Sequence, residues 1–202
     1  MTKPTESLAK NLQTIASYED YAEQYNTIVG ELPNANGIEG LRRVAAIAGA
    51  GGHILEIGSG PGRDADFLET LGAQIRRTDA TQRFLDLQAA RGKKGDLLNV
   101  ITDDLGGPYD AVVALCVLIH VARDQIDQVL AKITQSLRPG GAFLVSMRDG
   151  HGEKNGDYHT IYWTKDDFAA RIESAGMSIV WDKFNIGGDG DGWNTFLAVK
   201  PS

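Results

Sequence analysis

The sequence predicts a single α/β domain built on a mostly parallel sheet. Apolar runs of strand length alternate along the chain with longer segments whose apolar residues are spaced as on one face of a helix. One run, Tyr109 to Leu115, is almost continuously apolar, which is typical of a central parallel strand. Another, His53 to Ile57, leads into a glycine-rich turn and then a helix. Open sheets of this kind bind ligands where such strands end.

The expected elements follow from apolar period and from turn residues. Ile126, Val129, Leu130 and Ile133, for example, recur at helical spacing, and the run Arg138-Pro139-Gly140-Gly141 stops that helix. We expect helices at residues 5–29 (in two pieces), 38–48, 63–71, 84–91, 126–137 and 164–175. We expect strands at residues 53–57, 74–78, 97–101, 109–115, 142–147, 178–181 and 195–199.

Composition excludes several classes of function. The 202 residues suit one domain, and 42% hydrophobic content is enough for a core. A net charge of −7 and a pI of about 5.1 argue against strong binding to nucleic acid, which needs a basic face. Cys116 is the only cysteine, so no internal disulfide forms. The first ten residues carry no apolar signal core, and no apolar run is long enough to span a membrane, so we expect a cytoplasmic protein.

The glycine-rich turn carries the most specific motif in the chain. It reads Glu56-Ile57-Gly58-Ser59-Gly60-Pro61-Gly62, a G-x-G-x-G pattern with an acidic residue before it. Glycines let a ligand approach bare main chain, and the amides that open the next helix point at that ligand. A dinucleotide site needs a third glycine at position 63, where this chain has Arg63. The motif resembles the first motif of the class I S-adenosylmethionine-dependent methyltransferases.

The resemblance covers about residues 50 to 200 and implies a fold and an activity. It implies a Rossmann-like sheet of seven strands, mostly parallel, with helices on both faces and an antiparallel last strand. It implies a helical lid at residues 1–36 and a cofactor-binding methyltransferase domain at 37–202. The cofactor is then S-adenosylmethionine, which leaves as S-adenosylhomocysteine, and the acceptor is a small molecule attacked in line. The implied cofactor residues in the glycine turn are Glu56, Gly58, Ser59, Gly60, Gly62 and Arg63.

Three further stretches are candidates for holding the cofactor. Asp79 follows the second predicted strand, where a carboxylate accepts hydrogen bonds from ribose hydroxyls; Ala80 and Thr81 come next, and Thr81 suits a helix N-cap. Asp79 is otherwise an ordinary turn residue. Asp103 or Asp104, after the third predicted strand, is placed by the resemblance beside the adenine; the alternative is a solvated acidic loop. The resemblance also implies that Leu115 and Tyr25 contact the cofactor.

The end of the fourth predicted strand indicates which acceptors are disfavoured. It reads Leu115-Cys116-Val117-Leu118-Ile119-His120 and lacks the Asp/Asn-Pro-Pro-aromatic motif of exocyclic amine methylation of bases. It also lacks a Pro-Cys nucleophile and an acidic metal ligand, so we expect no metal. Cys116 is better interpreted as a small residue at the edge of the cofactor site. His120 is a candidate general base, and it is equally a candidate for capping a helix or fixing a loop.

Candidate acceptor contacts come from both ends of the chain. Tyr18 and Tyr21 precede Tyr25 in the N-terminal helical segment, where they either close the lid or pack the helix onto the domain. Arg148, His151 and Tyr158 lie in the polar segment after the fifth predicted strand, where α/β sheets place ligands. Two other functions stay open: an NAD(P)-dependent oxidoreductase and a non-catalytic protein that binds S-adenosylmethionine. The acceptor and the oligomeric state do not follow from the sequence.

Overall fold

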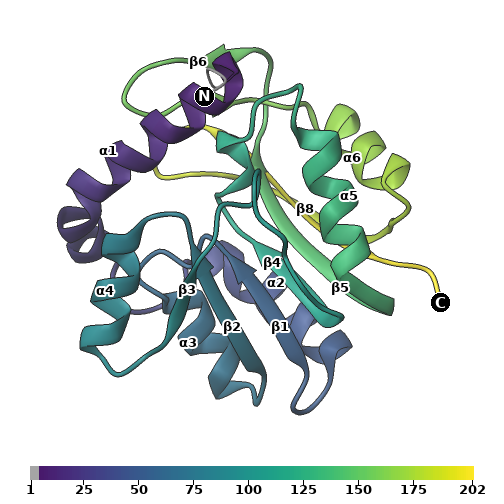
Figure 1. Ribbon diagram of the computed structural model, residues 1–202. Coiled ribbons are helices and arrows are strands. Elements are labelled where there is room, and N and C mark those ends of the chain that lie inside the picture. The colour runs from purple at the N-terminus through teal and green to yellow at the C-terminus, as the bar shows by residue number, and fades with distance from the viewer. Residues whose placement is uncertain (1–4) are drawn as a thin grey trace.

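The computed structural model describes residues 5–202, with the backbone only at residue 36; the first four residues of the expected lid lie outside this range. The chain alternates helices and strands around a central sheet (Figure 1). The helices are α1 (Glu6–Val29), α2 (Ala35–Ala48), α3 (Arg63–Thr70), α4 (Gln82–Ala90), α5 (Ile126–Ser136) and α6 (Lys165–Ser174), with a 3-10 turn at Leu118–His120. The strands are β1 (His53–Ile57), β2 (Gln74–Asp79), β3 (Gly95–Leu97), β4 (Tyr109–Ala114), β5 (Leu137–Arg148), β6 (Glu153–Lys154), β7 (Thr160–Ile161), β8 (Ser178–Ile186) and β9 (Gly192–Val199).

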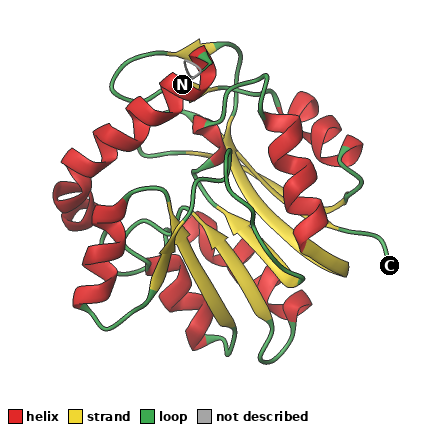
Figure 2. Ribbon diagram, viewed as in Figure 1, coloured by secondary structure: helices red, strands yellow, loops and turns green. Residues whose placement is uncertain are grey.

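The main sheet has seven strands in the order β3-β2-β1-β4-β5-β9-β8 (Figure 2). The first five pair in parallel, whereas β9 runs antiparallel to both β5 and β8. This confirms the expected mostly parallel sheet with a reversed last strand. The strand order changes direction between β1 and β4, and ligands of doubly wound sheets bind at that switch point.

Helices cover both faces of the sheet, and each face has its own core. On one face, α5 and α6 bury Ile126, Leu130, Ile133, Phe168 and Ile172 against β4, β5 and β9. On the other face, α2 and α3 pack on the sheet through Leu41, Val44 and Leu68. The helical spacing that predicted α2, α5 and α6 therefore marks residues that are buried here. No helix within the described residues is both long and apolar enough to cross a membrane.

Helix α1 is one continuous helix of 24 residues and not two pieces, since it has no internal glycine or proline to break it. It packs on α4 and crosses the end of the sheet at which β1 and β2 terminate (Figure 1). Its placement makes it the roof of whatever lies at that end of the sheet.

Strand boundaries differ from expectation at several places, and β5 begins at Leu137 instead of residue 142. β3 ends at Leu97 and not at residue 101, because the Asn99 side chain accepts a hydrogen bond from the Ile101 amide (3.0 Å) and turns the chain. The strands expected at 178–181 and 195–199 are longer and form the β8–β9 hairpin. The small β6–β7 sheet was not expected, and it folds part of the segment after β5 back over the domain.

Candidate active site

The three glycines after β1 have left-handed backbones, but for different reasons. A Cβ at Gly58 (φ +68°) would lie 2.3 Å from a methyl of Val117, and one at Gly62 (φ +90°) would lie 2.7 Å from the guanidinium of Arg77. Both glycines are required by packing. A Cβ at Gly60 (φ +53°) would meet only the Tyr25 ring, at 4.0 Å. Gly60 is therefore the glycine whose bare backbone faces open space.

Side chains from β2 and α4 hold the carbonyls of this loop. The fully buried Gln88 donates from Nε2 to the Gly60 carbonyl at 2.8 Å. Arg91 donates to the carbonyl of Pro61 and Arg77 to that of Gly62. Arg77 is 2% exposed and is itself fixed by carboxylates of α3. The loop is thus held rigidly before any ligand binds.

Asp79 ends β2 and faces the same loop. Its Oδ2 accepts from the Gly60 amide (2.8 Å) and its Oδ1 from the Thr81 amide (2.8 Å). Burial raises the pKa of the Asp79 carboxyl to about 6. Thr81 is the residue before α4, as expected, but its side chain makes no cap. Glu19 of α1 caps α4 instead, because its carboxylate accepts from the amides of Gln82 (2.6 Å) and Arg83 (2.9 Å).

Two cavities meet at this end of the sheet. The first lies between α1, the glycine loop and the ends of β2 and β4. Its floor includes Asp79, Phe84 and Asn99, and its roof is α1. The second cavity lies on the other side of Gly58 and Gly60. Leu115 and Cys116, at the end of β4, line both cavities.

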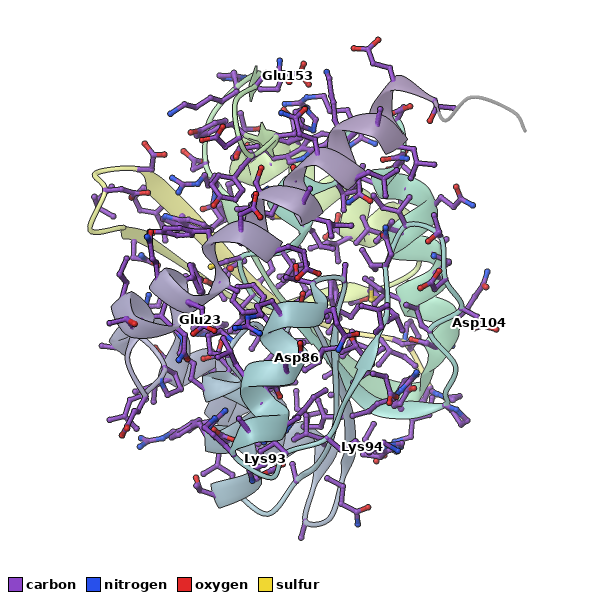
Figure 3. The ribbon with its side chains drawn as sticks, turned by 60° about the vertical axis from the view of Figure 1, so that its left-hand side comes forward. Glu23, Asp86, Lys93, Lys94, Asp104 and Glu153 are labelled. Atoms are coloured by element: carbon purple, nitrogen blue, oxygen red, sulfur yellow. The ribbon has the colours of Figure 1, made fainter. Side chains whose placement is uncertain are left out.

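The α1 roof contributes aromatic and polar groups. Asn11, Thr14, Ile15, Tyr18 and Tyr25 line the first cavity from above. Figure 3 shows Glu23 on the part of α1 that lies over α4, and its carboxylate pairs with Arg83 at 2.5 Å. The roof is therefore fastened to α4 by two carboxylates, Glu19 and Glu23.

Acidic groups beneath the glycine loop are buried without full partners. Glu56 is 3% exposed, and burial, together with the nearby Asp64, raises its pKa to about 8. Burial also raises the pKa of Asp64. Among the described side chains, Oε2 of Glu56, Oγ of Ser59 and Oδ1 of Asp64 are buried without a hydrogen-bond partner. Arg63 lines the second cavity, but its Nη1 donates to the Val29 carbonyl at the end of α1 (2.9 Å).

His120 lies at the first cavity with both ring nitrogens engaged. Nδ1 is 2.7 Å from the carbonyl oxygen of His159, and Nε2 is 3.1 Å from the hydroxyl of Tyr18. A carbonyl only accepts, so Nδ1 carries the proton and Nε2 accepts from Tyr18. Burial lowers the pKa of His120 to about 4, so the ring is neutral at neutral pH.

Four tyrosines were candidates, and the structure separates them. Tyr18 and Tyr25 line the first cavity, and Tyr25 lines the second as well. Tyr158 packs on Tyr18, with ring centroids 4.6 Å apart, without lining either cavity. Tyr21 contacts the edge of the Tyr25 ring from outside.

Two candidates from the end of β5 and the segment after it, Arg148 and His151, are not among the residues that line either cavity. Arg148 forms ion pairs with Asp189 (2.7 Å) and Asp191 of the β8–β9 loop and stacks on Trp193. Its positive charge is therefore already balanced by these carboxylates. His151 is exposed on the surface. Arg148 reaches the second cavity only through Asp189 and Trp193, which line it, so contact of Arg148 or His151 with an acceptor stays a prediction.

The acidic pair expected beside the adenine also lies outside. Asp103 accepts from the Asn99 amide, and Asp104 accepts from the Gly106 amide and points away from the molecule in Figure 3. Neither lines a cavity, because β3 ends early. Asn99 lines the first cavity in their place and donates to Asn11 of α1 (2.8 Å). A polar residue inside the apolar run Leu97 to Ile101 was the available signal for Asn99.

The described residues contain no cluster of three or more His, Cys, Asp or Glu side chains that is placed to hold a metal ion. Asn11, Thr14, Glu19 and Gln88 were not singled out from the sequence. All four act through contacts with segments distant in the chain, so no local pattern marks them.

Comparisons with known proteins agree with this arrangement. A family described as "Methyltransferase domain" matches residues 55–143, which run from β1 through the start of β5. The ubiquinone biosynthesis O-methyltransferase of Mesorhizobium japonicum is 32% identical over 103 residues, 46% of this chain and 39% of that protein. The protein-L-isoaspartate O-methyltransferase of Dinoroseobacter shibae is 32% identical over 122 residues, 58% of this chain and 55% of that protein. The chain thus spans only about two fifths to a little over half the length of these relatives.

Two solved structures share the whole architecture at low sequence identity. One is the Burkholderia thailandensis 1,6-didemethyltoxoflavin-N1-methyltransferase with S-adenosylhomocysteine; its TM-score is 0.78 at 20% identity, covering 100% of this chain and 92% of that one. The other is the N-methyltransferase NodS of Bradyrhizobium japonicum with S-adenosylhomocysteine; its TM-score is 0.77 at 16% identity, covering 94% and 100%. Motif, fold and matches agree: residues 55–143 match the methyltransferase-domain family, and the chain has the fold of these solved S-adenosylmethionine-dependent methyltransferases.

Proposed function

We propose that this protein transfers the methyl group of S-adenosylmethionine to a small-molecule acceptor. The observation that carries the proposal is the placement of Asp79. Its carboxylate stands at the end of β2, lines the first cavity, and is held on the glycine loop by the Gly60 and Thr81 amides. A carboxylate held in this way has lone pairs left for the two hydroxyls of a ribose.

The residues present fit the rest of the cofactor. Phe84, Leu98 and Val100 give the first cavity apolar walls that suit a purine, and Asn99 adds a polar group there. Asp64 lines the second cavity beside the glycine loop with an unpartnered carboxylate oxygen, which suits the amino group of the methionyl end. Gly60 leaves the backbone bare between the two cavities, where the sulfur must pass.

The protein's part in catalysis is alignment. The bound cofactor supplies a methyl group on a good leaving group, so holding donor and acceptor in line accounts for much of the rate. The loop fixed by Gln88, Arg77 and Arg91 holds the donor side still. Helix α1 covers the first cavity and excludes water from it.

Names of similar proteins support a small acceptor. The matched relatives and structures include enzymes named for a ubiquinone precursor pathway, for isoaspartate in proteins, and for didemethyltoxoflavin. The Burkholderia structure, which covers 100% of this chain and 92% of that one, is of an enzyme named for a small heterocycle. A small molecule is therefore the acceptor class that the architecture favours.

Calorimetric titration with S-adenosylmethionine, S-adenosylhomocysteine and NADH tests the cofactor. We expect the first two to bind and NADH not to bind; the reverse result would establish the oxidoreductase alternative. Asp79→Asn should weaken S-adenosylhomocysteine binding by about tenfold or more, because hydrogen bonds to a charged group contribute about 1.5–3 kcal/mol. Asp86→Asn, an exposed change on α4, is the matched control. Equal affinity in both variants would remove the ribose role of Asp79.

A further inference from the structure

The acceptor has to approach from the second cavity. The first cavity is closed above by α1 and carries the groups that suit a nucleoside. The second cavity meets it at Leu115 and Cys116 and extends to the β8–β9 hairpin. Its far wall is formed by Ser146, Thr195, Asn185 and Trp193, which are neutral polar groups and one indole. A planar ring with a few hydrogen-bonding atoms matches such a wall.

Within the described part of the chain, no side chain at the junction of the two cavities is free to take a proton from the acceptor. His120 gives its Nδ1 proton to the His159 carbonyl and uses its only free lone pair for the Tyr18 hydroxyl. Burial, and the neighbouring His159 and Arg148, lower its pKa to about 4, so a charged imidazolium is disfavoured there. As a base at neutral pH it would be both occupied and weak.

The other titratable groups facing this junction are also committed. Both oxygens of Asp79 accept backbone amides, and the proposed function uses their remaining lone pairs for the ribose hydroxyls. The Cys116 thiol lies beside the Ser146 hydroxyl at 3.6 Å, and enclosure by its neighbours raises its pKa, which keeps the thiol protonated. The Tyr18 and Tyr25 hydroxyls are held protonated by burial, which raises the pKa of each. Asp64 has a free oxygen but belongs to the methionyl end of the proposed cofactor.

Charge around the second cavity excludes anionic acceptors. Arg148, the last residue of β5, faces two carboxylates, Asp189 and Asp191, of the β8–β9 loop, so these three side chains carry a net negative charge. Arg63 lies 3.5 Å from Asp64 and donates to the Val29 carbonyl. Among the described residues lining the second cavity, Arg63 is the only cation, and two carboxylates, Asp64 and Asp189, line the cavity with it, which disfavours a carboxylate or a phenolate.

We propose, resting on the proposed function, that the acceptor atom is a neutral nitrogen of an aromatic amine or heteroaromatic ring, whose lone pair is free at neutral pH. The nitrogen lone pair forms the new N–C bond as the S–C bond breaks, and the electron pair of that bond stays on sulfur, which becomes a thioether. The product nitrogen carries the positive charge. If it holds a hydrogen, that proton passes to water after release, so no base is needed during transfer.

Other acceptor classes need what this site lacks. A phenol or catechol hydroxyl has a pKa near that of tyrosine, about 10, and must lose its proton to become a good nucleophile. An aliphatic amine resembles lysine, with a pKa of about 10.4, and arrives protonated without a lone pair. A carboxylate brings the charge that the second cavity leaves unpaired.

The test supplies S-adenosylmethionine with an isotopically labelled methyl group and reads the methylated atom by NMR. The acceptors are aniline, benzimidazole and para-aminophenol on one side, and phenol, catechol, para-hydroxybenzoate and benzylamine on the other. A small-molecule extract of the source cells is added as a further sample. Para-aminophenol offers nitrogen and oxygen on one ring, so it compares the two atoms under equal binding. We expect label on aromatic nitrogen only.

Three outcomes overturn the proposal: label on oxygen or carbon, label on benzylamine, or no labelled product from any sample. S-adenosylhomocysteine binding, measured on the same preparation, distinguishes a failure of the proposed acceptor class from a failure of the proposed function. Intact binding with any of these outcomes overturns the acceptor class alone, whereas absent binding overturns the proposed function as well.

A variant of His120 tests the missing base directly. His120→Gln keeps a side chain that can face Tyr18 and removes the imidazole. The rate of methyl transfer to any acceptor found above is measured from about pH 6 to about pH 9. We expect His120→Gln to lower this rate by the same factor at every pH, so that the shape of the pH–rate profile does not change. Loss of a limb of the pH profile in this variant would make His120 the base and overturn the proposal.

Discussion

Glu56 gives the protein a pH-dependent stability that a single substitution should remove. Its carboxyl is 3% exposed and has a pKa of about 8 in the folded protein, against 4.5 for an ordinary glutamate. A folded-state pKa above the unfolded value means that the stabilisation is complete below about pH 4.5 and is lost as the pH rises through about 8. At 1.36 kcal/mol per pKa unit, the difference of about 3.5 units gives an upper bound of about 5 kcal/mol. Glu56→Gln mimics the protonated form and does not titrate.

Urea unfolding followed by circular dichroism from about pH 5 to about pH 9 measures this effect. We expect the free energy of unfolding of the wild type to fall across this range. Glu56→Gln should match the wild type near pH 5 and exceed it by about 2–4 kcal/mol near pH 9. Burial also raises the pKa values of Asp64 and Asp79, so some slope remains in the variant. Exposed Glu173→Gln is the control. Parallel curves for wild type and Glu56→Gln would refute the reasoning.

Two further predictions concern the glycine loop and the α1 roof. Gly60→Ala and Gly72→Ala both place a side chain on a left-handed backbone, so each should lower the free energy of unfolding by about 1–2 kcal/mol. Only the side chain at position 60 projects into the cavity. We therefore expect only Gly60→Ala to weaken S-adenosylhomocysteine binding in calorimetry, and equal affinities would contradict this. Glu19→Gln removes the carboxylate that caps α4. We expect it to lower the local stability of the first turn of α4 by about 1 kcal/mol and so to speed amide hydrogen exchange at Gln82 and Arg83. Unchanged protection of these two amides would show that the cap is unimportant.

Local patterns predicted the parts of the site that depend on local backbone. The run from His53 to Gly62 was enough to place β1, its glycine turn and the start of α3, because glycine, apolar run and helix spacing all act within a few residues. Asp79 was placed at the end of β2 by the same reasoning. The ribose role of Asp79 stays a prediction until binding is measured.

The errors arose where a side chain ended an element or found a distant partner. The run from Leu97 to Ile101 has the composition of a strand, yet the Asn99 side chain turns the chain there, and this carried Asp103 and Asp104 away from the cavity. Arg148 was expected to border the acceptor pocket, but the sequence does not show that Asp191, 43 positions later, pairs with it. Charge pairing over such separations depends on the folded topology, which sequence spacing does not encode.

The roof and the chemistry of the site are not independent. Lys10, Thr14 and Tyr18 are spaced four apart, so they share one face of α1. Lys10 pairs with Glu153 (3.2 Å), and Glu153 holds the His159 ring (2.9 Å).

Thr14 accepts from the His159 amide (3.0 Å), the His159 carbonyl fixes the protonated nitrogen of His120, and Tyr18 occupies the other nitrogen. One face of α1 therefore sets the hydrogen-bonding state of His120, whose other partner, His159, lies 39 positions further along the chain. If α1 lifts to admit the cofactor, His120 loses Tyr18 at the same moment, so the closed roof is the condition under which this histidine has no lone pair to offer.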